Sequence, residues 1–186
     1  MNLLKYYNPN VKQLTNHESA FEYFQWILKQ YDFTVSHVNY QSKGRHKIYH
    51  CIKDEKEISI YVKYDKEWFH SFNHQFPEFI KQHPEYSGFG ESINVEYLSF
   101  AVNNNIDFVV FVNKEGEIYQ IQAKELHEFC KKYKLYRSQN RTFNYKLTNF
   151  TGEREEQIEQ TYSFPLNILT NWINVWKQNS RKEEFL

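Results

Sequence analysis

Residues 107–124 read DFVVFVNKEGEIYQIQAK and combine side chains that suit a metal site with a pattern typical of two paired strands. Asp107 stands at one end of the stretch, and Gln122 and Lys124 stand at the other. Carboxylate and amide oxygens are ligands for hard cations such as Mg²⁺. The stretch therefore has two interpretations, a metal-dependent nuclease site or a plain hairpin that runs into a helix.

The predicted turn sets the register of this hairpin. With a turn at residues 113–116, Val112 pairs with Glu117, and counting outward places Asp107 opposite Gln122. Directly opposed side chains lie about 5 Å apart. Asp107 and Gln122 are therefore predicted to reach one ion.

Two further side chains complete the predicted site. Strand alternation puts Lys124 on the same face as Gln122. Glu91 or Glu96, in the helical stretch 91–105, supplies the remaining carboxylate. The predicted metal ligands are Asp107, Gln122 and Glu91.

The plain alternative explains the same residues without chemistry. Asp107 is then an ordinary residue between a loop and a strand, and Lys124 lies in the first turn of a helix that begins near Ala123. Both interpretations need the same two strands, so the sequence leaves the choice open.

Composition limits the classes of protein that this chain can belong to. Of its 186 residues 40% are hydrophobic and 19% aromatic, which excludes a disordered chain and predicts a single domain over residues 1–186. The 23 basic residues balance the 23 acidic ones, so DNA binding has to come from a local patch. The sequence has no Gly-rich phosphate loop, which argues against nucleotide hydrolysis. Since no apolar stretch is long enough to cross a bilayer, we expect a cytoplasmic, intracellular protein without a membrane partner.

Periodicity and turn residues predict the elements that position these side chains. Thr15 with Glu18 predicts a capping box that opens a helix over residues 16–30. Alternating stretches then predict three strands, the last two joined at the polar turn 53–56. Residues 65–90 are predicted to form a short helix and a long loop, and helices are predicted over 91–105 and 123–133, on either side of the 107–124 hairpin. An exposed hairpin with a mobile tip at 151–157 follows. The last predicted helix carries an apolar stripe of Leu166, Leu169, Ile173 and Trp176. This order predicts an α/β domain with a mixed central sheet flanked by helices.

The order helix, strand, strand, strand, helix, strand over residues 16–124 resembles the core of the restriction-endonuclease-like, or PD-(D/E)XK, nuclease superfamily. Members carry a strand that opens with Asp, a neighbouring strand with Glu or Asp, any residue and Lys, and often a Glu on the first helix. The string Gln122-Ala123-Lys124 is similar to a glutamine variant of this motif. The resemblance implies a hydrolase that cleaves DNA with Mg²⁺ or Mn²⁺, in which Lys124 positions the attacking water.

A second register follows the order of elements more closely. The strand EISIYVK is then the catalytic strand with Lys63 as its lysine, and the acid position falls on Tyr61. Glu57 shares the face of Lys63, but six residues of strand separate the two by roughly 20 Å. The missing acid then comes from Glu22 on the first helix or from Glu91. This register is typical of a degenerate member that does not cut.

A second hypothesis is a module that binds nucleic acid without catalysis. Basic and aromatic residues interleave in several stretches, and lysine and arginine grip phosphates while tyrosine stacks on bases. The stretch SKGRHK lies between two predicted strands, where a loop can reach a groove. Lys43, Arg45 and Lys47 are its predicted phosphate contacts.

A third hypothesis is a protein-interaction module, either an inhibitor or a homodimer subunit. Trp172 and Trp176 are four residues apart on the predicted last helix. One of the two is then exposed as an anchor for a partner or a second copy, whereas both are buried if they belong to the core.

Overall fold

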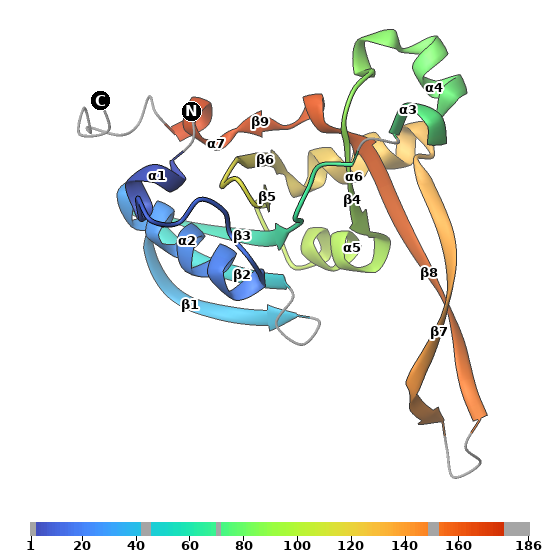
Figure 1. The fold of residues 1–186 in the computed structure, drawn as a ribbon, viewed down its shortest axis with the longest axis horizontal. Coiled ribbons are helices and arrows are strands. Elements are labelled where there is room, and N and C mark those ends of the chain that lie inside the picture. Colours follow the sequence, from blue (N-terminus) through green and yellow to red (C-terminus); the bar gives the residue numbers. More distant parts are fainter. Residues whose placement is uncertain (1–2, 42–45, 70–71, 149–152, 177–186) are drawn as a thin grey trace.

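The computed structural model describes residues 3–41, 46–69, 72–148 and 153–176. Figure 1 shows a layered body with a long two-stranded arm, β7 and β8, that extends away from it. No helix in these ranges combines the length and the apolar character that crossing a membrane requires. The chain is an α/β protein built on a mixed sheet, as the sequence predicts.

A mixed sheet forms the centre of the body. Within the described residues it has six strands in the order β1-β2-β3-β5-β6-β9. β3 and β5 are parallel, and every other neighbouring pair is antiparallel. The strands are β1 (Thr34–Gln41), β2 (His46–Lys53), β3 (Lys56–Tyr64), β5 (Phe108–Val112), β6 (Ile118–Gln122) and β9 (Thr170–Asn171).

The tight turn between β2 and β3 is explained by the backbone angles of its own two central residues. Asp54 and Glu55 have φ angles of 49° and 63°, and positive φ at both central residues is typical of the two-residue hairpin turn whose twist matches that of the strands. Lys53 pairs with Lys56 across this turn. The two strands predicted around the turn are confirmed.

Helix α2 (His17–Gln30) agrees with the predicted helix, but its cap differs from the prediction. The Asn16 side chain accepts a hydrogen bond from the Ser19 backbone N–H at 2.8 Å, and Ser19 Oγ accepts from the Asn16 N–H at 3.1 Å. The predicted capping box of Thr15 and Glu18 is therefore wrong by one residue. The observed capping box stabilises the helix start in the same way as the predicted one, because two otherwise unpaired N–H groups are satisfied reciprocally.

The two faces of the sheet bury two separate cores. On one face α2 packs with Ile60, Val62 and the last helix. On the other face lie Tyr61, the helices α5 (Val95–Asn103) and α6 (Ala123–Tyr133), and a smaller sheet. Successive residues of a strand point to opposite faces, so Lys63, like Tyr61, lies on the side of the smaller sheet.

The smaller sheet has the strand order β4-β8-β7 within the described residues. Its first strand, β4 (Gly90–Asn94), occupies the start of a stretch predicted to be helical, so that prediction is wrong for residues 91–94. The strand is fixed by antiparallel pairing with β8, a partner about 70 residues away that no local pattern reveals. β7 (Tyr136–Thr148) and β8 (Glu153–Pro165) form the predicted hairpin, and residues 149–152 of its predicted tip lie outside the described residues.

The last segment is not one continuous helix as predicted. It consists of a 3₁₀ turn, the short strand β9 that pairs with β6, and the helix α7 (Trp172–Trp176). Trp172 is fully buried and Trp176 is 8% exposed, so neither ring is an exposed anchor. The remaining short elements are α1 (Leu4–Tyr7), α3 (Phe72–Gln75), α4 (Pro77–Gln82) and the 3₁₀ turns η2 (Pro84–Tyr86) and η4 (Leu166–Ile168).

Candidate functional site

The 107–124 hairpin exists, but its register differs by one residue from the prediction. Val112 pairs with Ile118, and Phe108 pairs with Gln122. Gly116, with a φ of 74°, closes a loop that is one residue longer than the predicted turn. The Asn113 side chain fixes this loop by accepting hydrogen bonds from two backbone N–H groups within it. A slip of one residue moves a side chain to the other face, so Asp107 and Gln122 do not face each other.

Asp107 has a structural role at the start of β5. Its carboxylate accepts hydrogen bonds from the Ser59 backbone N–H at 2.9 Å and from Ser59 Oγ at 3.3 Å. Its own backbone bonds to Ser59 on one side and to Ala123 on the other. Asp107 therefore ties β5 to β3, as the plain interpretation of the hairpin expects.

Gln122 and Lys124 lie where β6 turns into α6. Gln122 is at the N-cap position of α6, where its side chain makes no capping hydrogen bond, and Lys124 lies in the first turn of the helix. Both are exposed. The three residues of the first predicted site, Asp107 included, therefore do not converge on one point.

Glu91, the fourth member of that predicted site, lies elsewhere in the molecule. It belongs to β4 rather than to a helix, and it is 2% exposed. Lys63, the lysine of the second predicted register, reaches it across the space between the two sheets. Lys63 of β3 is paired with Phe111 of β5, and Asp107 lies four residues before Phe111, just ahead of the first residue of β5. The two predicted sites thus lie about four strand residues apart, or roughly 13 Å along the strand.

An ion cluster forms around Lys63, and we call Lys63, Asp65 and Glu91 the crossover cluster. Lys63 Nζ lies 2.7 Å from Asp65 Oδ2 and 3.5 Å from Glu91 Oε1. It also donates a hydrogen bond to the Ser92 carbonyl at 2.6 Å. The Ser92 N–H in turn donates to Glu91 Oε1 at 2.8 Å. These contacts fasten the end of β3 to β4.

Asp65 escaped the predictions although the sequence contains a signal for it. It follows Lys63 by two residues at the end of a strand, and residues two apart share a strand face. Its side chain is 31% exposed, compared with 15% for Lys63 and 3% for Glu91. The crossover cluster therefore opens to solvent on the side of Asp65.

The surroundings of Glu91 in the crossover cluster disfavour its ionisation. Burial raises the pKa of Glu91 well above its ordinary value; Lys63 counteracts this shift, and hydrogen bonding and repulsion by Asp65 add to it. Glu91 Oε2 is buried and has no hydrogen-bond partner among the described residues, whereas Asp65 Oδ2 faces the Lys63 ammonium at 2.7 Å. Burial and Asp65 therefore favour the neutral form of Glu91, whereas Lys63 favours its charged form.

Lys63 remains charged within this pair of acids. Burial on its own lowers the pKa of the Lys63 ammonium, but the charges of Asp65 and Glu91 outweigh burial, and the pKa lies above its ordinary value. The buried hydroxyl of Tyr61, two residues earlier on the same strand, has no hydrogen-bond partner among the described residues. Tyr61 occupies the acid position of the second register, and the acidic side chains that contact Lys63 are Asp65 and Glu91.

Glu22, the other acid proposed for the second register, is on the wrong side of the sheet. It is exposed on α2, which packs against the face opposite to that of Lys63. The sheet therefore separates Glu22 from the crossover cluster.

The predicted basic loop is described only in part. Lys43 and Arg45 lie outside the described residues. Lys47 belongs to β2 rather than to a loop, and its Nζ lies 4.8 Å from the centre of the Phe21 ring. Of the three predicted phosphate contacts, Lys47 therefore lies within the described residues, and its side chain lies over Phe21 of α2.

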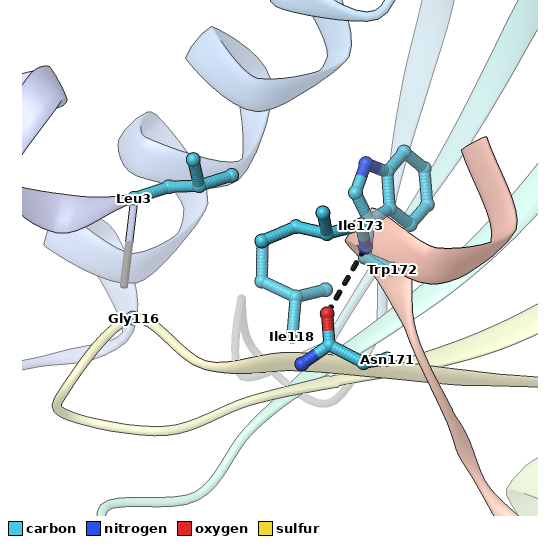
Figure 2. A pocket seen from close by; sticks show the side chains of 6 residues that line it. All are labelled: Leu3, Gly116, Ile118, Asn171, Trp172 and Ile173. Carbon is cyan, nitrogen blue, oxygen red and sulfur yellow. Dashed lines mark hydrogen bonds between the residues drawn. The ribbon is translucent and has the colours of Figure 1, made fainter. Parts of the chain in front are cut away.

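Two hollows differ greatly in size. The first, lined by Leu3, Gly116 and Trp172 among others, holds about 10 Å³, which is room for about one water molecule. Figure 2 shows it between the start of the chain and α7, where Asn171 accepts a hydrogen bond from the Ile173 N–H at 3.0 Å. The second has a volume of about 360 Å³ and is lined by residues of the loop before β4 and of η4.

Among the described residues, no three His, Cys, Asp or Glu side chains gather closely enough to hold a metal by themselves. Mg²⁺ commonly keeps several waters and takes only one or two carboxylates from a protein. The crossover cluster offers such a pair. Comparisons with protein-family models, with curated proteins and with solved structures found no match.

Proposed function

We propose that this chain is a nuclease-like protein that acts on DNA by metal-dependent hydrolysis of phosphodiester bonds, and that its centre is the crossover cluster. The observation that carries the proposal is that Asp65 and Glu91 meet at Lys63, with Glu91 Oε2 buried and without a hydrogen-bond partner among the described residues. Two carboxylates can bind a divalent cation, which competes with protons because the ligands have to be deprotonated.

The residues present fit Mg²⁺ or Mn²⁺ chemically. The side chains of Asp65 and Glu91 offer the hard oxygen ligands, and Asp65 lies on the solvent side where a phosphate can approach. A bound Mg²⁺ supplies charge stabilisation for the phosphate and a more acidic water. Lys63, held by two acids and the Ser92 carbonyl, keeps its proton and orients the attacking water.

The resemblance to the PD-(D/E)XK superfamily supports this assignment at one residue. Lys63 is the next-to-last residue of β3, the third strand after α2, where the second register expects the motif lysine. The acids depart from the motif, because Asp65 follows the lysine and Glu91 comes from β4. The proposal therefore replaces Asp107, Gln122 and Lys124 by a different set around Lys63.

Cleavage and metal binding test the proposal together. The protein is incubated with plasmid, linear and branched DNA in Mg²⁺, in Mn²⁺ and in a chelator, while Mn²⁺ binding is measured by titration calorimetry. We expect metal-dependent nicking that Asp65→Asn and Glu91→Gln each reduce at least 100-fold, together with weaker Mn²⁺ binding. Lys124→Ala is the matched control and should leave both unchanged. Equal products in the chelator, or loss of activity in the control alone, contradicts the proposal.

A non-catalytic DNA-binding module is the second candidate. Tyr61 favours it, because a tyrosine fills the position where the motif has an acid. The same assay separates the two functions. DNA binding without nicking in any metal supports the module and rules out the nuclease.

A further inference from the structure

The larger hollow is lined in part by residues that are close in sequence to the crossover cluster. Its wall includes Phe89, two residues before Glu91, and Tyr119 of β6. Leu166 and Leu169 add apolar surface, and Ser87 and Asn167 add polar groups. A volume of about 360 Å³ falls within the roughly 300–1,000 Å³ of small-ligand sites. The hollow is therefore large enough for one compact group with a flat apolar body and polar edges.

Two aromatic residues at this hollow, Phe89 and Tyr119, are held in place by contacts with their neighbours. The Phe89 side chain is 48% exposed although its backbone is fixed, since its carbonyl accepts a hydrogen bond from the Leu166 N–H at 2.8 Å. Tyr119 packs edge to face against Trp68, with ring centres 5.6 Å apart. Bases of single-stranded nucleic acid stack on such rings regardless of sequence.

A cation, Arg137, lies beyond the same loop. The guanidinium of Arg137 is 5.8 Å from the centre of the Phe69 ring, and Phe69 is bridged to Gly90, the residue after Phe89. Among the described residues Arg137 makes no ion pair, and its buried Nε has no hydrogen-bond partner. An apolar hollow and a positive charge that has no acidic partner among the described residues together complement a ligand that is both aromatic and anionic.

We propose that this hollow binds an unpaired base of the DNA on which the crossover cluster acts, with Arg137 contacting a phosphate of the same strand. The inference rests on the proposed function and narrows its substrate class to single-stranded, branched or locally opened DNA. In paired DNA the base faces are stacked within the helix, so a base has to leave the stack to enter the hollow. A fully paired blunt duplex is accordingly a poor ligand.

Fluorescence of 2-aminopurine in a short single strand tests the inference in chelator, where binding is measured apart from cleavage. We expect quenching on binding to the intact protein and much weaker binding of the same sequence as duplex. Phe89→Ala should weaken binding roughly 5-fold to 150-fold, the loss of one stacked base. Phe89→Trp should retain binding, and Phe100→Ala, which removes another exposed ring on α5, should have no effect.

Arg137 has its own readout, because a phosphate contact appears in the salt dependence. Arg137→Gln should flatten the plot of log affinity against log salt by about one unit, whereas Lys124→Gln should not. Unquenched fluorescence, or equal binding of single strand and duplex, overturns the inference even if DNA is cleaved. Quenching without cleavage in any metal overturns the proposed catalysis and keeps the base site. Capture of an apolar peptide that Phe89→Ala abolishes, without quenching by DNA, assigns the hollow to a protein partner and overturns the inference.

Discussion

The two ends of the paired strands β3 and β5 carry similar residue types in very different surroundings. At the start of β5, Asp107 binds backbone and Lys124 lies on an exposed helix turn. At the end of β3, Lys63 meets Asp65 and Glu91 in a largely buried place. The first end satisfies its charges with local hydrogen bonds and with water, whereas the second concentrates three charges that depend on one another. The second arrangement is the one on which the proposed function rests, because perturbed ionisation needs burial and close neighbours.

Removal of the lysine from the crossover cluster should change the free energy of unfolding more than any other substitution compared below. Lys63→Met leaves two neighbouring carboxyl groups without a cation, and breaking a buried pair in this way costs about 3–5 kcal/mol. The free energy of unfolding, measured by urea denaturation, should fall by that amount. Lys124→Met makes the same chemical change at the other end of the strands. Equal stability of the two variants would show that solvent screens the crossover cluster as well.

The pH dependence of stability should sharpen the comparison at Glu91. Its raised pKa means that the folded protein binds this proton more tightly than the unfolded chain does. The stability that the proton contributes is complete below the ordinary pKa of glutamate, about 4.3, and is lost as pH rises through the raised value. Glu91→Gln, a change that costs about 1–3 kcal/mol at low pH, should flatten this decline. A decline identical to that of the intact protein would assign it to other groups.

Asp107→Ala should have a smaller effect. It removes the acceptor of the Ser59 N–H bond and should destabilise the fold by about 1 kcal/mol. DNA cleavage and Mn²⁺ affinity, measured on the folded variant, should not change. A loss of metal binding here would restore the first predicted site.

Lys124→Met should have the smallest effect of all. The residue is exposed in the first turn of α6, and substitutions at such surface positions usually change stability by less than about 0.5 kcal/mol. Thermal unfolding and DNA cleavage should both match those of the intact protein. Loss of cleavage would mean that the hairpin end, and not the crossover cluster, positions the attacking water.

Local sequence was sufficient for the elements whose cause is local. The positive φ angles at Asp54 and Glu55 suit a tight hairpin, and the apolar spacing of α2 matches a helix with one buried face. The 107–124 hairpin was likewise predictable, but its register was not. One residue more in the loop, fixed by Asn113 and Gly116, was enough to part Asp107 from Gln122.

Tertiary structure decided everything that depends on distant partners. β4 replaces the first turn of a predicted helix because β8 pairs with it, and β9 interrupts the last predicted helix because it pairs with β6. The apolar stripe that predicted this helix is compatible with either structure, since burial and not periodicity alone selects between them.

The sequence by itself thus determined the class of fold and offered two candidate lysines, Lys124 and Lys63, together with the candidate acid Glu91. It did not determine that Lys63 and Glu91 meet, because 28 residues separate them and no helical or strand period links positions so far apart. Their meeting follows from packing β4 over the end of β3, which buries Glu91 and makes its charge depend on Lys63 and Asp65. A buried carboxyl group needs a partner, and only the assembled sheets supply one.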